Sequence, residues 1–240
     1  MEWNTYVDGY CERVEPGLFA EPLNAVSNLA FLIAAVVLWF TVRAAARTTP
    51  GSASAVYPLP VLIALIFLGS SAFHTAATRW GGALDTGFIA VFLLFYVAFF
   101  MHWFAGARWR LAWLAIPAFL VFTALVGFTL GRVVGSGTGM YLCALLGLFA
   151  FAAWLRWSGR DGLRRYWPWF AGAGAIFTVS LTFRSLDDAL CGSLPIGTHF
   201  LWHALNAVTL YVVSRAGIER WREVTAATPA VDDSRPVSST

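Results

Sequence analysis

Two histidines four residues apart, His199 and His203, lie in an apolar stretch of the chain. A helix completes a turn every 3.6 residues, so both side chains project from one face, where they can hold a metal ion together. A third histidine, His74, lies in another apolar stretch, shortly after Ser70 and before Asp85. Ionisable groups are costly inside a membrane and therefore mark functional sites.

Three histidines with one open position form the usual arrangement of a catalytic zinc ion, whose fourth ligand is water. Zinc lowers the pKa of that water to about 7 and polarises a carbonyl oxygen. Ser70 shares a helical face with His74, so its hydroxyl could reach the water or a developing oxyanion. Asp85 is the candidate acid/base, or the group that orients the water.

Taken singly, these residues also fit structural roles. A His-x-x-x-His pair can serve in interfacial packing or hydrogen bonds between helices, and a lone serine can bond to its own helix. The fourth histidine, His102, lies about 17 residues, or roughly 25 Å of helix, from Asp85. We expect it to be an interfacial histidine without a ligand role. The five residues Ser70, His74, Asp85, His199 and His203 together favour a metal site.

The composition is that of an integral membrane protein. Hydrophobic residues make up 59% of the 240 and charged residues 12%, with a mean hydropathy of +0.68, whereas about a quarter of a soluble domain is charged. Each apolar stretch approaches the roughly 20 residues that span a bilayer; the stretches are 24–42, 57–77, 84–104, 111–130, 138–155, 167–183 and 199–214. We predict an all-α, seven-transmembrane helix bundle with an intramembrane zinc site.

Three regions follow from these stretches. They are an acidic arm over residues 1–23, the bundle over 24–215, and a polar tail over 216–240, which we expect to be disordered. The first twenty residues contain no apolar run of the kind found in a cleavable signal sequence.

The chain contains arginine and no lysine, and the arginines are unevenly distributed. Twelve fall in the tail and in the loops after the first, third and fifth stretches, and four on the opposite side. Since positive residues favour the cytoplasm, we expect the N-terminus outside and the C-terminus inside, in a plasma or inner membrane. The same count places the candidate site at the outer end. The basic pI of about 9.0 then reflects topology and not a nucleic-acid partner.

The segments Ser70–His74 and His199–His203, together with Asp85, resemble the alkaline ceramidase family. That family is a branch of the seven-helix zinc hydrolases that include the adiponectin-receptor-like proteins. Similarity extends to the acidic segments Asp8–Glu12 and Glu21–Asn28, to Phe183–Asp187 and to Cys191, and so covers most of the chain.

The resemblance implies a membrane amidohydrolase of sphingolipid metabolism that acts on linear amides (EC 3.5.1 type). Ceramide or a similar N-acyl lipid from the bilayer would yield a fatty acid and a long-chain base. By this resemblance His74, His199 and His203 hold zinc, Asp85 activates the water and Ser70 stabilises the tetrahedral intermediate. The alanine-rich composition without lysine suggests a bacterium with GC-rich DNA, where ceramide is scarce.

The resemblance also implies calcium in the arm. Calcium prefers oxygen ligands, and the candidates are Asp8, Glu12, Glu21 and Asn24. One residue is inserted between Asp8 and Glu12 relative to the family, so a solvated acidic arm is the alternative reading.

The resemblance further implies a disulfide between Cys11 and Cys191, with two free thiols as the alternative. Cys143 is interpreted as a small packing residue. Near the last stretch, Arg184 is expected to form a structural ion pair with Asp187 or Asp188; contact with a substrate head group is the alternative.

Two functions compete with the hydrolase. A seven-helix receptor or sensor would use the zinc structurally, with a fourth protein ligand. A metal or proton transporter would need polar groups through to the inner face, where the stretches are apolar. The sequence leaves open the exact lipid, amide or ester preference, synthesis by the reverse reaction, and the oligomeric state.

Overall fold

The computed structural model describes residues 2–130, 136–160 and 162–227. Within these ranges the regular elements are helices, and one isolated bridge joins Tyr6 to Thr78. The all-α prediction is therefore confirmed for the described residues. The long helices are α2 (Leu29–Thr48), α3 (Pro58–Ala76), α4 (Arg79–Trp103), α6 (Ala115–Thr129), α8 (Ser136–Trp157), α9 (Trp167–Leu190) and α10 (His199–Ala227). Shorter elements are α1 (Pro22–Ser27), α5 (Trp109–Ala112) and the 3-10 turn η1 (Arg164–Tyr166).

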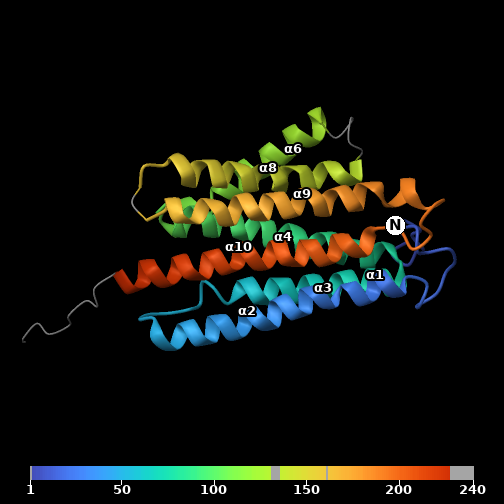
Figure 1. Cartoon of the computed structure of the whole chain (residues 1–240), viewed down its shortest axis with the longest axis horizontal. Coiled ribbons are helices and arrows are strands. Elements are labelled where there is room, and N and C mark those ends of the chain that lie inside the picture. The colour runs from blue at the N-terminus through green and yellow to red at the C-terminus, as the bar shows by residue number, and fades with distance from the viewer. Residues whose placement is uncertain (1, 131–135, 161, 228–240) are drawn as a thin grey trace, which may run out of the picture.

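The long helices lie side by side in one bundle (Figure 1). Helix α10 packs against α2, α3, α4 and α9, while α8 packs between α9 and α6. The N-terminal arm lies at the end of the bundle where α9 passes into α10 (Figure 1). The central position of α10 lets residues of its first turns face several neighbouring helices at once.

Five helical segments are long and apolar enough to cross a membrane, namely Pro22–Thr48, Pro58–Ala76, Arg79–Trp103, Trp109–Thr129 and Gly139–Trp157. These five candidate spans indicate a membrane protein. Helices α9 and α10 are long enough as well, at 24 and 29 residues. They are more polar, because α9 ends with Arg184, Asp187 and Asp188 and α10 carries charged residues in its second half.

The predicted disordered tail over 216–240 is wrong in its first part, since α10 continues to Ala227. Ala216, Gly217, Ile218 and Trp221 are buried there. An ion pair between Arg215 and Glu219, one helical turn apart, adds to this burial. The bundle therefore reaches beyond the expected boundary at 215; residues 228–240 lie outside the described part of the chain.

The hairpin between α3 and α4 brings the ends of two predicted segments together. Ala77 adopts a left-handed backbone conformation with φ 43°, which ends α3. The Thr78 hydroxyl accepts a hydrogen bond from the Gly81 N–H (3.3 Å) and so caps α4. This tight turn leaves His74 and Asp85 at the same end of the bundle.

Candidate metal centre

Three histidines from two helices converge at one end of the bundle. His74 belongs to the last turn of α3, and His199 and His203 to the first turns of α10. One ring nitrogen of each lies within 4.8 Å of the others, and all three side chains are buried. Among the described residues, this is the group of three histidine, cysteine or acidic side chains that could hold a metal ion. The structure thus brings together the three predicted ligands.

The hydrogen bonds of His74 orient its ring. Its Nδ1 lies 2.6 Å from Glu21 Oε2. A carboxylate oxygen accepts, so Nδ1 carries the proton and Nε2 keeps a free lone pair. That Nε2 is buried and has no hydrogen-bond partner. A carboxylate behind a histidine is the usual outer support of a metal ligand.

His203 is supported in the same way by a hydroxyl. Ser27 Oγ lies 2.7 Å from His203 Nδ1 and also donates to the Asn24 carbonyl oxygen (2.9 Å). Since the hydroxyl has one proton and gives it to the carbonyl, its oxygen accepts from the Nδ1–H of His203. The Nε2 of His203 is then free to coordinate a cation.

The third ligand, His199, is held through its backbone. Its N–H donates to Asp187 Oδ1 (2.9 Å), as does the N–H of Thr198 (2.5 Å). Its ring stacks on Tyr10 at 3.6 Å between centroids, and its Nδ1 is buried without a partner. Burial raises the pKa of the Tyr10 hydroxyl, which therefore stays neutral over the ring.

The donor set fits a metal ion. Buried polar atoms without partners are rare, because an unmade hydrogen bond costs free energy, and two of the three rings carry one. A cation would satisfy these nitrogens. Imidazole suits zinc and neighbouring transition metals better than calcium or magnesium.

Ser70 and Asp85 lie next to the histidines. Ser70 is buried, its side chain forms a hydrogen bond with the Asp85 carboxylate, and Asp85 interacts electrostatically with His74. A side chain at Gly69 would approach the Leu84 carbonyl oxygen to 2.8 Å. The glycine therefore permits the close contact of α3 and α4 that brings Ser70 to Asp85. The five predicted site residues share one location.

The arm contributes a residue that sequence reasoning missed. Arg13 is 3% exposed, its Nε donates to Glu21 Oε1 (2.5 Å), and its Nη2 donates to the His74 carbonyl oxygen (3.1 Å). Burial by itself would raise the pKa of Glu21, but hydrogen bonds from His74, Arg13 and Asn24 hold it below its usual value. The position of Arg13 between Glu12 and Glu15 is the sequence feature that could have indicated a buried ion pair.

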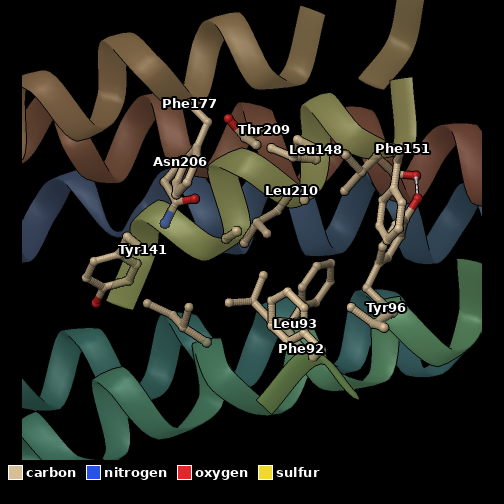
Figure 2. Close-up of a pocket in the computed structure, with 16 residues that line it drawn as sticks. Phe92, Leu93, Tyr96, Tyr141, Leu148, Phe151, Phe177, Asn206, Thr209 and Leu210 are labelled. Carbon is tan, nitrogen blue, oxygen red and sulfur yellow. Dashed lines mark hydrogen bonds between the residues drawn. The ribbon is translucent and has the colours of Figure 1, made fainter. Parts of the chain in front are cut away.

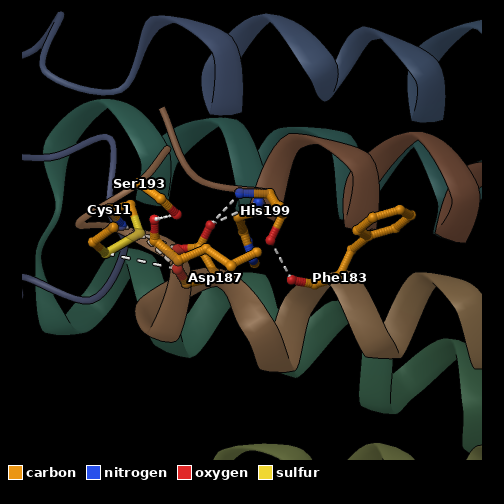
Figure 3. The surroundings of a disulfide bond; sticks show 8 residues. Cys11, Phe183, Asp187, Ser193 and His199 are labelled. Carbon is orange, nitrogen blue, oxygen red and sulfur yellow. Dashed lines mark hydrogen bonds between the residues drawn. A yellow bond between two sulfur atoms is a disulfide. The ribbon is translucent and has the colours of Figure 1, made fainter. Parts of the chain in front are cut away.

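The disulfide implied by the family resemblance is present between Cys11 and Cys191 (Figure 3). Asp187 lies beside it and accepts a hydrogen bond from the Cys11 N–H (3.0 Å) as well as those from the start of α10. The arm, the end of α9 and the start of α10 are thus joined at one point. Cys143 is buried and free.

The predicted calcium ligands have other partners in the structure. Both Glu12 oxygens accept from backbone N–H groups, those of Leu23 (2.6 Å) and Asn24 (2.8 Å). Glu21 binds Arg13 and His74, while Asn24 donates to Glu21 (2.9 Å). Asp8 is exposed and lines a cavity beside the disulfide. Calcium binding by Asp8, Glu12, Glu21 and Asn24 stays a prediction.

The expected ion pair of Arg184 with Asp187 or Asp188 is wrong. The Asp187 carboxylate accepts hydrogen bonds from the backbone N–H groups of Cys11 in the arm and of Thr198 just before α10. Arg184 instead places its guanidinium over the rings of Tyr141 (4.9 Å) and Trp202 (5.7 Å). The backbone N–H groups that begin a helix attract a carboxylate, and this competing partner is not visible in the sequence pattern.

An apolar cavity lies inside the bundle, lined by residues of α4, α8 and α10 (Figure 2). Tyr141 and Asn206 lie at one end, and Tyr96 and Phe151 at the other (Figure 2). The Tyr141 end is nearest the metal centre, because Tyr141 packs on Trp202, the neighbour of His203. At the other end the Tyr96 hydroxyl donates a hydrogen bond to the Val213 carbonyl oxygen (2.6 Å), and the Phe151 ring lines the cavity.

His102 belongs to a different part of the molecule. It lies in the last turn of α4, donates from Nδ1 to the Ala107 carbonyl oxygen (2.8 Å) and stacks on Trp109 (4.1 Å).

No protein-family model matches this chain, and a search of curated proteins finds no match either. The likeness to the alkaline ceramidases therefore rests on the residues named above.

Proposed function

We propose that the protein is a membrane-embedded, zinc-dependent amidohydrolase. It cleaves the amide bond of ceramide or a similar N-acyl lipid and releases a fatty acid and a long-chain base. The observation that carries this proposal is the meeting of three buried histidines with the Ser70–Asp85 pair at one end of an apolar bundle. When bound, zinc supplies an activated water and polarises the carbonyl group.

The protein side chains have distinct roles in this reaction. His74, His199 and His203 hold the metal, and Glu21 and Ser27 keep two of the rings in place. The Asp85 carboxylate accepts a proton from the attacking water and delivers it to the amide nitrogen as the carbon–nitrogen bond breaks.

The oxygen of that water ends on the acyl carbon and one of its protons on the leaving amine, so the atoms balance. The Ser70 hydroxyl donates to the carbonyl oxygen while that oxygen carries negative charge.

The surroundings suit a lipid substrate. In our proposal the acyl chain lies in the apolar cavity between Tyr141 and Tyr96, and the substrate continues past Tyr141 so that its carbonyl group reaches the histidines. In our proposal α9 and α10 cross the membrane with the five apolar spans, the N-terminus faces outward and the site opens at the outer leaflet.

A receptor or sensor with a structural zinc ion is the second candidate. Structural zinc sites are closed by four protein ligands, whereas the histidine cluster contains three side chains of ligating type among the described residues. This difference supports the catalytic reading.

The test combines metal analysis with lipid hydrolysis by the purified protein. We expect one zinc ion per chain and release of fatty acid from an N-acyl lipid, both lost in His199→Ala and both retained in the control His102→Ala. Asp85→Asn should retain zinc and lose about 100-fold or more in rate. A zinc-loaded protein that cleaves neither lipid amides nor esters would refute the hydrolase.

A further inference from the structure

We propose that Arg184 recognises a carboxylate on the polar part of the lipid, so that the substrates of this centre are N-acyl amino acids. This inference rests on the proposed amidohydrolase and narrows its substrate, so that the product released with the fatty acid is an amino acid and not a long-chain base.

Arg184 is a half-buried cation that forms no ion pair with the described residues. Its side chain contacts the buried rings of Tyr141 and Trp202. Aromatic faces offset part of the cost of removing a cation from water, but a buried charge is normally paired. An anion is the missing partner.

The position of Arg184 is that of a group beside the reacting bond. Its guanidinium lies 5.7 Å from the ring centre of Trp202, the neighbour of His203, and its charge interacts with those of Asp85, His199 and His203. Tyr141, which forms a hydrogen bond with it, also lines the mouth of the apolar cavity. A substrate whose acyl chain lies in that cavity and whose amide reaches the histidines passes Tyr141, which puts the group beyond the amide within reach of the guanidinium.

Three buried or half-buried acidic side chains near the centre have hydrogen-bond partners other than Arg184. Asp85 bonds with Ser70, and Glu21 bonds with Arg13 and His74. Asp187 accepts three backbone hydrogen bonds, from residues 11, 198 and 199. These three carboxylates are engaged by other groups, and the Arg184 guanidinium is available to a ligand.

This geometry favours an N-acyl amino acid over ceramide. In an N-acyl amino acid a single carbon separates the amide nitrogen from the carboxylate, so the cation must lie beside the metal centre. Ceramide is neutral and offers Arg184 no anion. The planar guanidinium binds a carboxylate through two parallel hydrogen bonds, which a lysine cannot reproduce. A free fatty acid also carries a carboxylate and could bind Arg184 in the same way, so the experiment compares its binding with that of N-acylglycine.

The experiment compares the zinc-loaded protein on N-acylglycine and on N-acylethanolamine with the same acyl chain. We expect a preference of 10-fold or more in kcat/KM for N-acylglycine. Arg184→Gln should reduce the ratio of the two kcat/KM values by about 10- to 100-fold, the loss typical of a charge-assisted pair, and Arg184→Lys by less. Arg79→Gln, which changes an exposed arginine at the same end of the bundle, should keep the ratio.

Binding to Asp85→Asn protein separates recognition from hydrolysis. If N-acylglycine binds and Arg184→Gln abolishes this binding, Arg184 recognises the carboxylate. If the unaltered protein then cleaves no amide, the hydrolase is refuted while this recognition stands. Equal cleavage of both amides, with a ratio unchanged in Arg184→Gln, would overturn recognition and leave the hydrolase standing. Fatty acid that binds as tightly as N-acylglycine, without a preference in turnover, would also overturn the substrate assignment.

Discussion

Glu21 shows how one carboxylate can organise a candidate metal centre. It is 2% exposed and accepts hydrogen bonds from His74, Arg13 and Asn24. Its negative charge offsets Arg13 and fixes the proton of His74 on Nδ1, which directs the Nε2 lone pair toward the other two histidines. A residue that the family resemblance assigns to calcium thus faces the histidines.

We expect Glu21→Gln to weaken zinc binding by about 10- to 100-fold, the usual effect of losing a carboxylate behind a histidine ligand. The amide keeps the shape but cannot balance the charge of Arg13. Competition with a chelator measures the affinity. Glu12→Gln makes the same change in the same arm at a residue that bonds to the backbone N–H groups of Leu23 and Asn24. Equal affinity in the two variants would contradict the role of Glu21.

At the scale of elements, the start of α10 depends on a three-part junction. Asp187 of α9 binds the first N–H groups of α10 and the Cys11 N–H of the arm. Gly197 enters this junction with φ +63°, and a Cβ there would lie 2.9 Å from Cys11 Cβ and collide with the Asp187 carboxylate. The turn before His199 therefore requires glycine.

Gly197→Ala should destabilise the protein by about 1–3 kcal/mol, because alanine is strained at this φ and displaces the Asp187 cap. Thermal unfolding in detergent checks this, with a lower Tm expected. Gly192→Ala is the matched control, since a Cβ at Gly192 meets nothing within 4 Å. Identical melting of the two variants would show that the junction does not limit stability.

On the scale of the whole molecule, the polar groups are unevenly placed. The disulfide, the arm and the histidines share one end of the bundle, and the ion pairs Arg165–Glu223 and Arg215–Glu219 lie in or against the second half of α10. Disulfides form outside the reducing cytoplasm. The Cys11–Cys191 bond therefore agrees with the orientation expected from the arginines.

In a bacterial host we expect the disulfide to form only when the periplasmic oxidation machinery is intact. Alkylation before and after reduction measures this, and Cys143 is the internal control because it is buried and free. A fluorescent protein fused to the C-terminus should fluoresce, as such fusions do in the cytoplasm. A disulfide that forms equally in the absence of periplasmic oxidase would contradict an outward-facing N-terminus.

The sequence by itself determined the helices and the five central residues of the site, namely Ser70, His74, Asp85, His199 and His203. Apolar length indicates the helices, and the four-residue spacing of His199 and His203 fixes their common face, because both depend on local backbone geometry. The number of membrane crossings between the apolar stretches places His74 at the same end of the bundle as His199 and His203. The same local rules failed for residues 216–227, where burial of Trp221 keeps a charged segment helical.

Only the tertiary structure decided which polar groups meet. Arg13 binds Glu21 and the backbone of His74, Asp187 accepts from the start of α10, and Arg184 lies over the ring of Tyr141. Each of these outcomes is a competition between partners distant in sequence. Which partner a charged side chain binds depends on the distances and the burial that result from helix packing, and the sequence specifies neither directly.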